Sequence, residues 1–152
     1  MIAQEEIRRV LGLYVQRLDD RDVDGCAELF APEGAYVSRT GEHRGRSAIR
    51  STLEDMCSTQ PRGWRTLHHL SSPVIDMLGD SEAEVVTDLV VYECFDDLPW
   101  GIRATGRHRD RMVLNDGLWL FSEKQVESDS FVRLSSGRTQ TTDPLPSAAS
   151  LS

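Results

Sequence analysis

The sequence predicts an α+β domain, in which three N-terminal helices pack on a strongly curved antiparallel sheet and form a cone-shaped barrel around one pocket. Apolar residues recur at helical spacing before Pro61, whereas apolar and polar residues alternate after Gly63. Helices followed by a run of strands are the order typical of this fold class. The 152 residues suffice for one domain with a real hydrophobic core.

Three amphipathic segments predict the helices. The first covers residues 2–18, and the second is a short helix for which Asp22 provides the N-terminal cap. Pro32 and Gly34 end the second helix, and Ser47 can cap the third. The inward faces are formed by Ile7, Val10, Leu11, Tyr14, Val15 and Leu18 in the first helix, by Val23, Cys26, Ala27, Leu29 and Phe30 in the second, and by Ile49, Leu53, Met56 and Cys57 in the third.

Alternating side chains predict the strands. A brief strand is predicted around Tyr36. A turn through Gly41 and Gly45 follows this strand and precedes the third helix. The turn Asn115-Asp116-Gly117 is a good hairpin signal between the last two strands. The four longer strands cover residues 66–77, with a bend at 71–73, and residues 82–95, 101–114 and 118–127.

Composition narrows the class of partner. The formal net charge is −8 and the pI is about 4.9, which argues against nucleic acids and anionic membranes. No apolar run approaches the ~18 residues of a membrane span, and the acidic N-terminus does not resemble a secretory signal. We therefore expect a cytoplasmic protein. Its three cysteines show neither a zinc-binding spacing nor a complete disulfide framework.

The C-terminal segment differs in composition from the rest of the chain. Residues 134–152 are rich in Ser, Thr, Pro and Gly and offer little apolar surface to bury. We therefore predict one domain over residues 1–133, followed by a tail over residues 134–152.

The strand over residues 101–114 carries the clearest alternation. Its odd positions hold four arginines, which predicts a solvated arginine ladder on the outer face. His108 and Asp110 then point inward, where they need hydrogen-bond partners or a water-filled pocket. Structural hydrogen bonding and a role in a pocket remain equally open for these two residues. The ladder consists of Arg103, Arg107, Arg109 and Arg111, and the inward set of Ile102, Ala104, Gly106, His108, Asp110 and Met112.

His68 and His69 lie side by side in a predicted strand, so one points inward and the other outward. The alternation does not choose between them, because each face also carries one leucine. A catalytic histidine needs a carboxylate that orients it. Asp19, at the end of the first helix, is a candidate, although an aspartate at a helix end is more often a cap or solvated.

Several stretches together resemble a SnoaL-like domain of the nuclear-transport-factor-2-like superfamily. They are YVQRLDDRDVDGCAELFAPEGAY, GEHRGRSAI, TLHHLSSPVID, GRHRD and NDGLWLF, and the resemblance covers residues 5–129. This superfamily includes scytalone dehydratase, ketosteroid isomerase, and bile-acid and polyketide dehydratases and cyclases. The resemblance implies a curved antiparallel sheet wrapped by three helices around a deep pocket.

The resemblance also implies roles for individual residues. Asp19 matches the aspartate that ends the first helix in scytalone-dehydratase-like members, and His68 matches the histidine that this aspartate holds. Tyr14 matches a pocket tyrosine, and Asp88 lies near the place of another pocket acid. His69 is kept as a reserve for His68.

Two positions depart from the family pattern. The GRHRD motif has His108 where tyrosine is usual, and Lys124 stands where many members have arginine. We expect the Asp110 carboxylate to favour the charged form of His108, which then serves as general acid beside a neutral His68. That division of labour predicts a bell-shaped pH–rate profile.

The function predicted from these residues is that of a cofactor-independent lyase or isomerase: a dehydratase, isomerase or cyclase. His68, held by Asp19, removes a proton next to a carbonyl, and Tyr14 or His108 stabilises the enolate or protonates the departing hydroxyl. The expected substrate is small, hydrophobic and cyclic, polyketide- or steroid-like. Tyr36 and Trp64 are candidate pocket walls, with His69, Asp88 and Asp110 as further candidate substrate contacts, although core packing is the simpler explanation for Tyr36 and Trp64.

Two other readings remain open. The domain can be a non-catalytic module that binds a small ligand or dimerises. A metal site of His68, His108 and Asp110 is the third reading, but the metal-binding spacings H-x-H and HExxH are absent, so we expect no metal. We also expect a homodimer that pairs through the outer face of the sheet, with the arginine ladder at its rim or matched by acids such as Glu84 and Glu123.

Overall fold

The computed structural model describes residues 2–131, and its elements follow the predicted order. The predicted boundary at residue 133 and the tail over residues 134–152 lie outside the described residues. The helices are α1 (Ile2–Asp19), α2 (Val23–Glu28) and α3 (Arg46–Ser58). The strands are β1 (Phe30–Ser38), β2 (Gly41–Arg44), β3 (Trp64–Leu70), β4 (Val74–Met77), β5 (Glu82–Phe95), β6 (Gly101–Asn115) and β7 (Leu118–Phe131).

The strands form one curved sheet of seven strands that does not close on itself. Its order is β2-β1-β7-β6-β5-β3, and β4 also pairs with β5. The predicted bend at residues 71–73 separates β3 from β4, and both strands pair antiparallel with β5. One pairing differs from the expected antiparallel pattern, because β1 lies parallel to β7.

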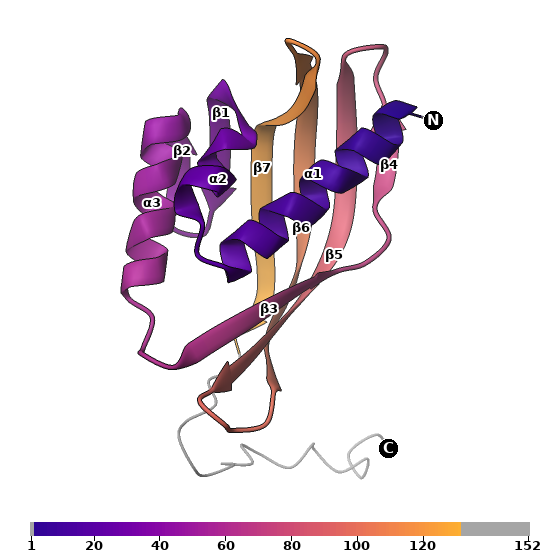
Figure 1. The fold of residues 1–152 in the computed structure, drawn as a ribbon. Coiled ribbons are helices and arrows are strands. Elements are labelled where there is room, and N and C mark those ends of the chain that lie inside the picture. The colour runs from indigo at the N-terminus through magenta and orange to yellow at the C-terminus, as the bar shows by residue number, and fades with distance from the viewer. Residues whose placement is uncertain (1, 132–152) are drawn as a thin grey trace, which may run out of the picture.

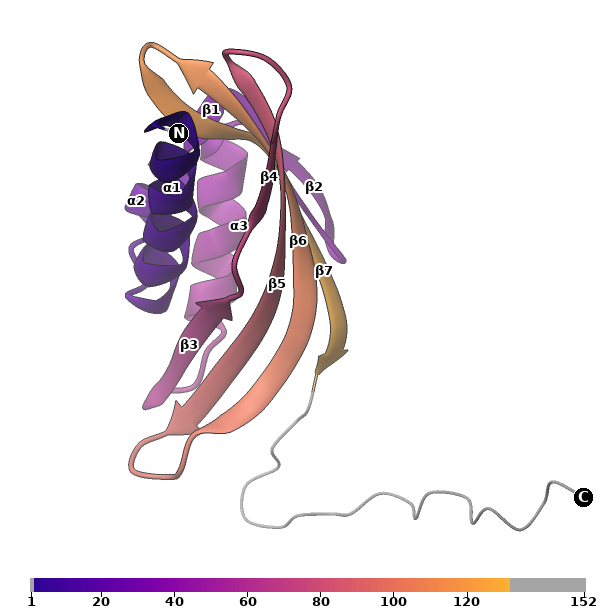
Figure 2. The ribbon, with the colours of Figure 1, turned by 90° about the vertical axis from the view of Figure 1, so that its right-hand side faces the viewer.

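All three helices lie on the concave face of this sheet (Figures 1 and 2). Helix α1 crosses the sheet diagonally, while α2 and α3 lie beside it over the edge formed by β1 and β2. The predicted α+β class, with three helices packed on a curved sheet, is therefore confirmed. Within residues 2–131, no helix has both the length and the apolar character needed to cross a bilayer.

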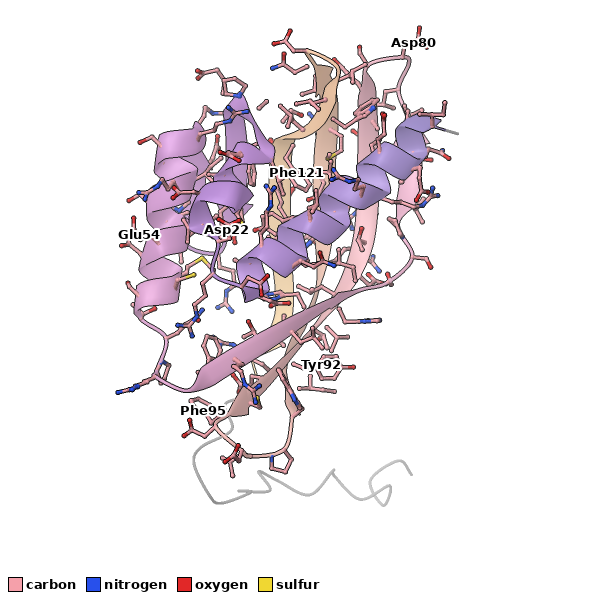
Figure 3. The ribbon with its side chains drawn as sticks, viewed as in Figure 1. Asp22, Glu54, Asp80, Tyr92, Phe95 and Phe121 are labelled. Carbon is pink, nitrogen blue, oxygen red and sulfur yellow. The ribbon has the colours of Figure 1, made fainter. Side chains whose placement is uncertain are left out.

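An aromatic cluster joins α1 to the sheet. The ring of Phe121 on β7 lies 5.6 Å from that of Tyr14 on α1 and 5.2 Å from that of Phe30 on β1, measured between centroids. Phe121 and Phe30 are completely buried. Figure 3 labels Phe121 on β7, next to α1. Because Tyr14 belongs to this cluster, the cluster also sets the position of a candidate site residue.

The outer face of the sheet carries the predicted charged ladder. Arg107 pairs with Asp88, Arg109 with Glu127 and Arg111 with Glu84, each across neighbouring strands. The expected partner Glu84 is thus present, whereas among the described ion pairs Glu123 has none. Pairing of two copies through this face stays a prediction.

Removing the buried Phe121 ring should destabilise the domain more than removing the exposed Leu118 side chain of the same strand. We expect Phe121→Ala to lower the free energy of unfolding by about 3–5 kcal/mol, because it leaves a cavity in the core. Leu118→Ala is the matched control, since Leu118 is 65% exposed, and should change the free energy by no more than about 0.5 kcal/mol. Urea denaturation measures both; equal effects would contradict the assigned core.

Candidate active site

A cavity of about 380 Å³ lies between the helices and the concave face of the sheet. Its size falls in the range of small-molecule pockets. Its buried lining residues are Tyr14, Tyr36, Trp64, Leu89, Val91, Ala104 and His108, and its exposed lining residues, at the mouth, are Arg39, Thr40, Met56, Thr59 and Pro61.

The Asp19 carboxylate holds His68 inside this cavity. Asp19 Oδ1 lies 2.6 Å from His68 Nδ1, and both side chains are mostly buried. A carboxylate accepts hydrogen bonds, so Nδ1 carries the proton and Nε2 is the ring nitrogen left unprotonated in the neutral imidazole. Since His68 lines the cavity, the arrangement offers a proton acceptor to a bound molecule.

Asp19 owes its position to β3 as well as to α1. It is the last residue of the helix, where the macrodipole disfavours a negative charge. Hydrogen bonds from β3 offset this cost: the Thr66 hydroxyl donates to Oδ1 at 3.0 Å, and the His68 backbone N–H donates to Oδ2 at 2.9 Å. The carboxylate therefore accepts three hydrogen bonds from one strand, which restricts its orientation.

The alternation along β3 decides between the two histidines. Trp64, Thr66 and His68 point into the cavity, whereas His69 is exposed on the other face and does not line it. The expected contact of Asp19 with His68, rather than with His69, is present. The prediction that His69 contacts the substrate was wrong, because adjacent strand residues face opposite sides of the sheet.

A second polar cluster lies beneath the cavity floor. Lys124 on β7 is buried, and its Nζ lies 3.0 Å from Asp110 Oδ2 and 3.2 Å from His108 Nδ1. Burial lowers the pKa of Lys124 and raises that of Asp110, and each charge opposes the shift of the other. The close contact stabilises the ion pair, because the attraction between the two buried charges compensates the cost of removing each from water.

Lys124 determines the state of His108. An ammonium only donates, so Nδ1 of His108 accepts and its Nε2 carries the proton. Burial holds the pKa of His108 well below its usual value, and the positive charge of Lys124 lowers it further. The expectation of a charged His108 was therefore wrong: Lys124 lies between the imidazole and Asp110 and takes up the carboxylate's charge.

Two tyrosine hydroxyls add neutral donors to the cavity wall. Burial raises the pKa of Tyr14 well above its usual value and that of Tyr36 to about 12. Both phenols remain protonated at neutral pH. No hydrogen-bond partner for the Tyr14 hydroxyl occurs among residues 2–131, so it remains available to a molecule in the cavity.

Arg103 was expected on the outer ladder, but it lines the cavity. Val91 pairs with Ala104 and Tyr92 with Ile102, so Arg103 is an extra residue in a β-bulge. The bulge reverses the alternation in the first residues of β6. Arg103 faces the cavity, and Ile102, expected inside, is half exposed. A bulge is not visible in the residue pattern.

Two further predicted contacts fall outside the cavity. Asp88 lies on the outer face and pairs with Arg107, so its assignment as a pocket acid was wrong. Asp110 is buried against Lys124 and does not line the cavity. Lys124 also separates two members of the proposed metal set of His68, His108 and Asp110, and no group of three metal-ligating side chains occurs within the described part of the chain.

Besides Arg103, sequence reasoning missed two residues of this site. Thr66 shares a strand face with His68, two positions away, which was the available signal for a hydroxyl beside the Asp19 carboxylate. Lys124 was noted only as a departure from the family pattern, although an inward lysine in a buried strand calls for a charged partner.

A broader hollow of about 710 Å³ touches Asp19 and Thr66 but neither His68 nor His108.

The chain also matches the model of a known protein family. The model of a family described as a SnoaL-like domain matches residues 1–125. The chain belongs to the SnoaL-like domain family. This family includes polyketide cyclases and scytalone dehydratase. Among curated protein sequences, no relative matches the chain.

Solved structures share the fold of this SnoaL-like domain. ActVI-ORFA from Streptomyces coelicolor has a TM-score of 0.77 at 21% identity, covering 85% of this chain and 98% of that one. A provisionally assigned scytalone dehydratase from Novosphingobium aromaticivorans has a TM-score of 0.73 at 24% identity, covering 94% and 96%. A Catenulispora acidiphila protein in complex with S-DNPA has a TM-score of 0.74 at 21% identity, covering 84% and 93%.

The depressed pKa of His108 has a consequence for stability. Below its ordinary value of 6.5, the unfolded chain binds a proton at this position and the folded SnoaL-like domain does not. The free energy of unfolding therefore falls as the pH falls, by up to about 1.4 kcal/mol per pH unit from this group. Urea denaturation should show this slope below about pH 6.5 and no contribution from His108 well above it.

The variant His108→Gln isolates that contribution. Its amide oxygen can still accept from Lys124, but it cannot titrate. As the pH falls, the free energy of unfolding of the wild type should therefore fall more steeply than that of the variant. A difference of the opposite sign would mean that the folded state binds the proton at His108 more tightly than the unfolded chain.

Proposed function

We propose that this SnoaL-like domain is a cofactor-independent lyase or isomerase that removes a proton next to a carbonyl group. The observation that supports this most directly is the 2.6 Å contact between Asp19 and His68, which leaves the second ring nitrogen facing an otherwise largely apolar cavity. A base held in one tautomer by a carboxylate is the arrangement that general base catalysis needs.

The proton acceptor is His68 Nε2. In the neutral imidazole it is the unprotonated nitrogen, because Nδ1–H donates to Asp19. When it takes the proton from carbon, the imidazole becomes positively charged, and the Asp19 carboxylate stabilises that charge. The same proton then returns either to another carbon, which is an isomerisation, or to a β-hydroxyl that leaves as water, which is a dehydration.

The enolate oxygen is stabilised by neutral donors. His108 presents Nε2–H, and Tyr14 presents a hydroxyl with no protein partner among the described residues. Donors that are already oriented act most strongly on charge that appears in the transition state. The buried Lys124 ammonium, in contact with His108, adds positive potential behind this donor.

The cavity suits a small cyclic substrate. Leu89, Val91 and Ala104 form an apolar floor, and the rings of Tyr36 and Trp64 form walls. The volume of about 380 Å³ fits a molecule of two or three rings. The family's dehydratases and cyclases act on such compounds, which makes a polyketide-like cyclic ketone the proposed substrate class.

Replacing His68 should abolish proton abstraction. A suitable probe is α-tetralone with a hydroxyl at the carbon β to the carbonyl, because its dehydration yields naphthol and water. We expect His68→Gln to slow this reaction roughly 100- to 10,000-fold, and Asp19→Asn to reduce it by a smaller factor, because the tautomer is less well held. Naphthol fluorescence measures the rate.

The matched control is His69→Gln, which replaces the neighbouring histidine on the outer face and should leave the rate unchanged. Deuterium exchange at the carbon next to the carbonyl of α-tetralone tests the first step alone. If the wild-type protein binds these ketones but catalyses neither exchange nor dehydration, the proposal fails and a binding module of the same fold is the better description.

The state of His108 predicts the shape of the pH–rate profile. A neutral His108 does not lose its remaining ring proton in the accessible alkaline range, so the rate should stay level on the alkaline side. His108→Phe should lower the rate across the whole range without changing that shape. An alkaline limb that disappears in His108→Phe would instead indicate a charged His108 acting as general acid.

A further inference from the structure

We propose that the mouth of this cavity binds an anionic group of the substrate, a carboxylate, through Arg103. This inference rests on the proposed function, and it narrows the substrate class to cyclic ketones that carry a carboxylate. The carboxylate contacts the guanidinium at the mouth, while the reacting carbon lies deeper, next to His68.

The charge of the cavity wall is the first argument. The chain has a net charge of −8, yet none of the described residues that line the cavity is an aspartate or a glutamate. The permanently charged groups among them are two arginines, Arg39 and Arg103. An acidic protein repels anions in general, so a locally positive cavity mouth favours an anionic ligand there.

The second argument is the way in which Arg103 is held. The bulge in β6 turns it into the cavity, and its guanidinium lies 4.2 Å from the centre of the Trp64 ring. Trp64 is itself buried in the cavity wall. Stacking of this kind restricts the planar guanidinium and leaves its N–H edge available for a bidentate partner.

Glu93 supports this arrangement from behind. Its carboxylate accepts a hydrogen bond from Trp64 Nε1 at 2.7 Å and lies 3.5 Å from Arg103 Nη1. The Glu93 side chain is 7% exposed, whereas that of Arg103 is 35% exposed. The long contact to Glu93 engages one nitrogen, and the other donors of Arg103 have no partner among residues 2–131. They are the donors that an incoming carboxylate would use.

The test compares two probes of the same shape and different charge, β-naphthoate and β-naphthamide, by isothermal titration calorimetry. We expect the wild type to bind the carboxylate about tenfold more tightly than the amide, as for one charge-assisted hydrogen-bonded contact. Added salt should weaken binding of the carboxylate and leave that of the amide unchanged. Arg103→Gln should remove the preference.

Two further variants make the assignment specific. Arg109→Gln removes an arginine from the outer face of the same strand and should leave the preference intact. Glu93→Gln keeps an acceptor for Trp64 but removes the charge that competes for Arg103, so it should strengthen binding of the carboxylate several-fold. The double variant Glu93→Gln with Arg103→Gln avoids an unpaired buried carboxylate and should show no preference.

The inference is overturned if β-naphthoate fails to bind, if the wild type binds both probes equally, or if the preference survives in Arg103→Gln and in the double variant. Because these measurements need no turnover, they are independent of the acid–base proposal. Loss of the carboxylate preference with intact dehydration by His68 would remove this inference alone. A clear preference without any catalysis would remove the acid–base proposal and leave an anion-binding cavity.

Discussion

The burial of the Lys124 ammonium is the constraint on which the site depends. The side chain is 1% exposed, and an unpaired charge in that position would cost several kcal/mol. Asp110 lies opposite Lys124 in the register of β6 with β7, so the ion pair forms only when these two strands pair as they do. The rings of Tyr14 and Phe121, whose centres lie 4.5 and 4.6 Å from the ammonium, close the space above it.

From this constraint follows the difference between the two histidines of the cavity. His68 meets a carboxylate through Nδ1 and keeps an unprotonated Nε2, whereas His108 meets an ammonium through Nδ1 and keeps a protonated Nε2. The same side chain thus becomes a proton acceptor on β3 and a neutral proton donor on β6. A reaction that moves a proton from carbon while charge develops on oxygen needs one group of each kind.

Much of the architecture was visible in the residue pattern, because helices and strands bury one face at a fixed period. The spacing of Ile7, Val10 and Leu11 placed α1 correctly, and the inward positions of β6 from Ala104 to Met112 were predicted without error. The pattern failed where the period itself is broken. The bulge at Arg103 leaves no mark in the alternation. The assignment of Asp88 to the pocket came from the resemblance and not from the alternation.

The sequence by itself determined the fold class, the family, and the pairing of Asp19 with a histidine of β3. Local periodicity and a loose set of motifs carry that information, since both depend on residues close together in the chain. The resemblance had also selected His68 over His69. Only the tertiary structure decided that Lys124 keeps His108 neutral and that Arg103 points inward. Each of these depends on which groups meet across strands far apart in sequence, and the charge of a buried group is set by those neighbours.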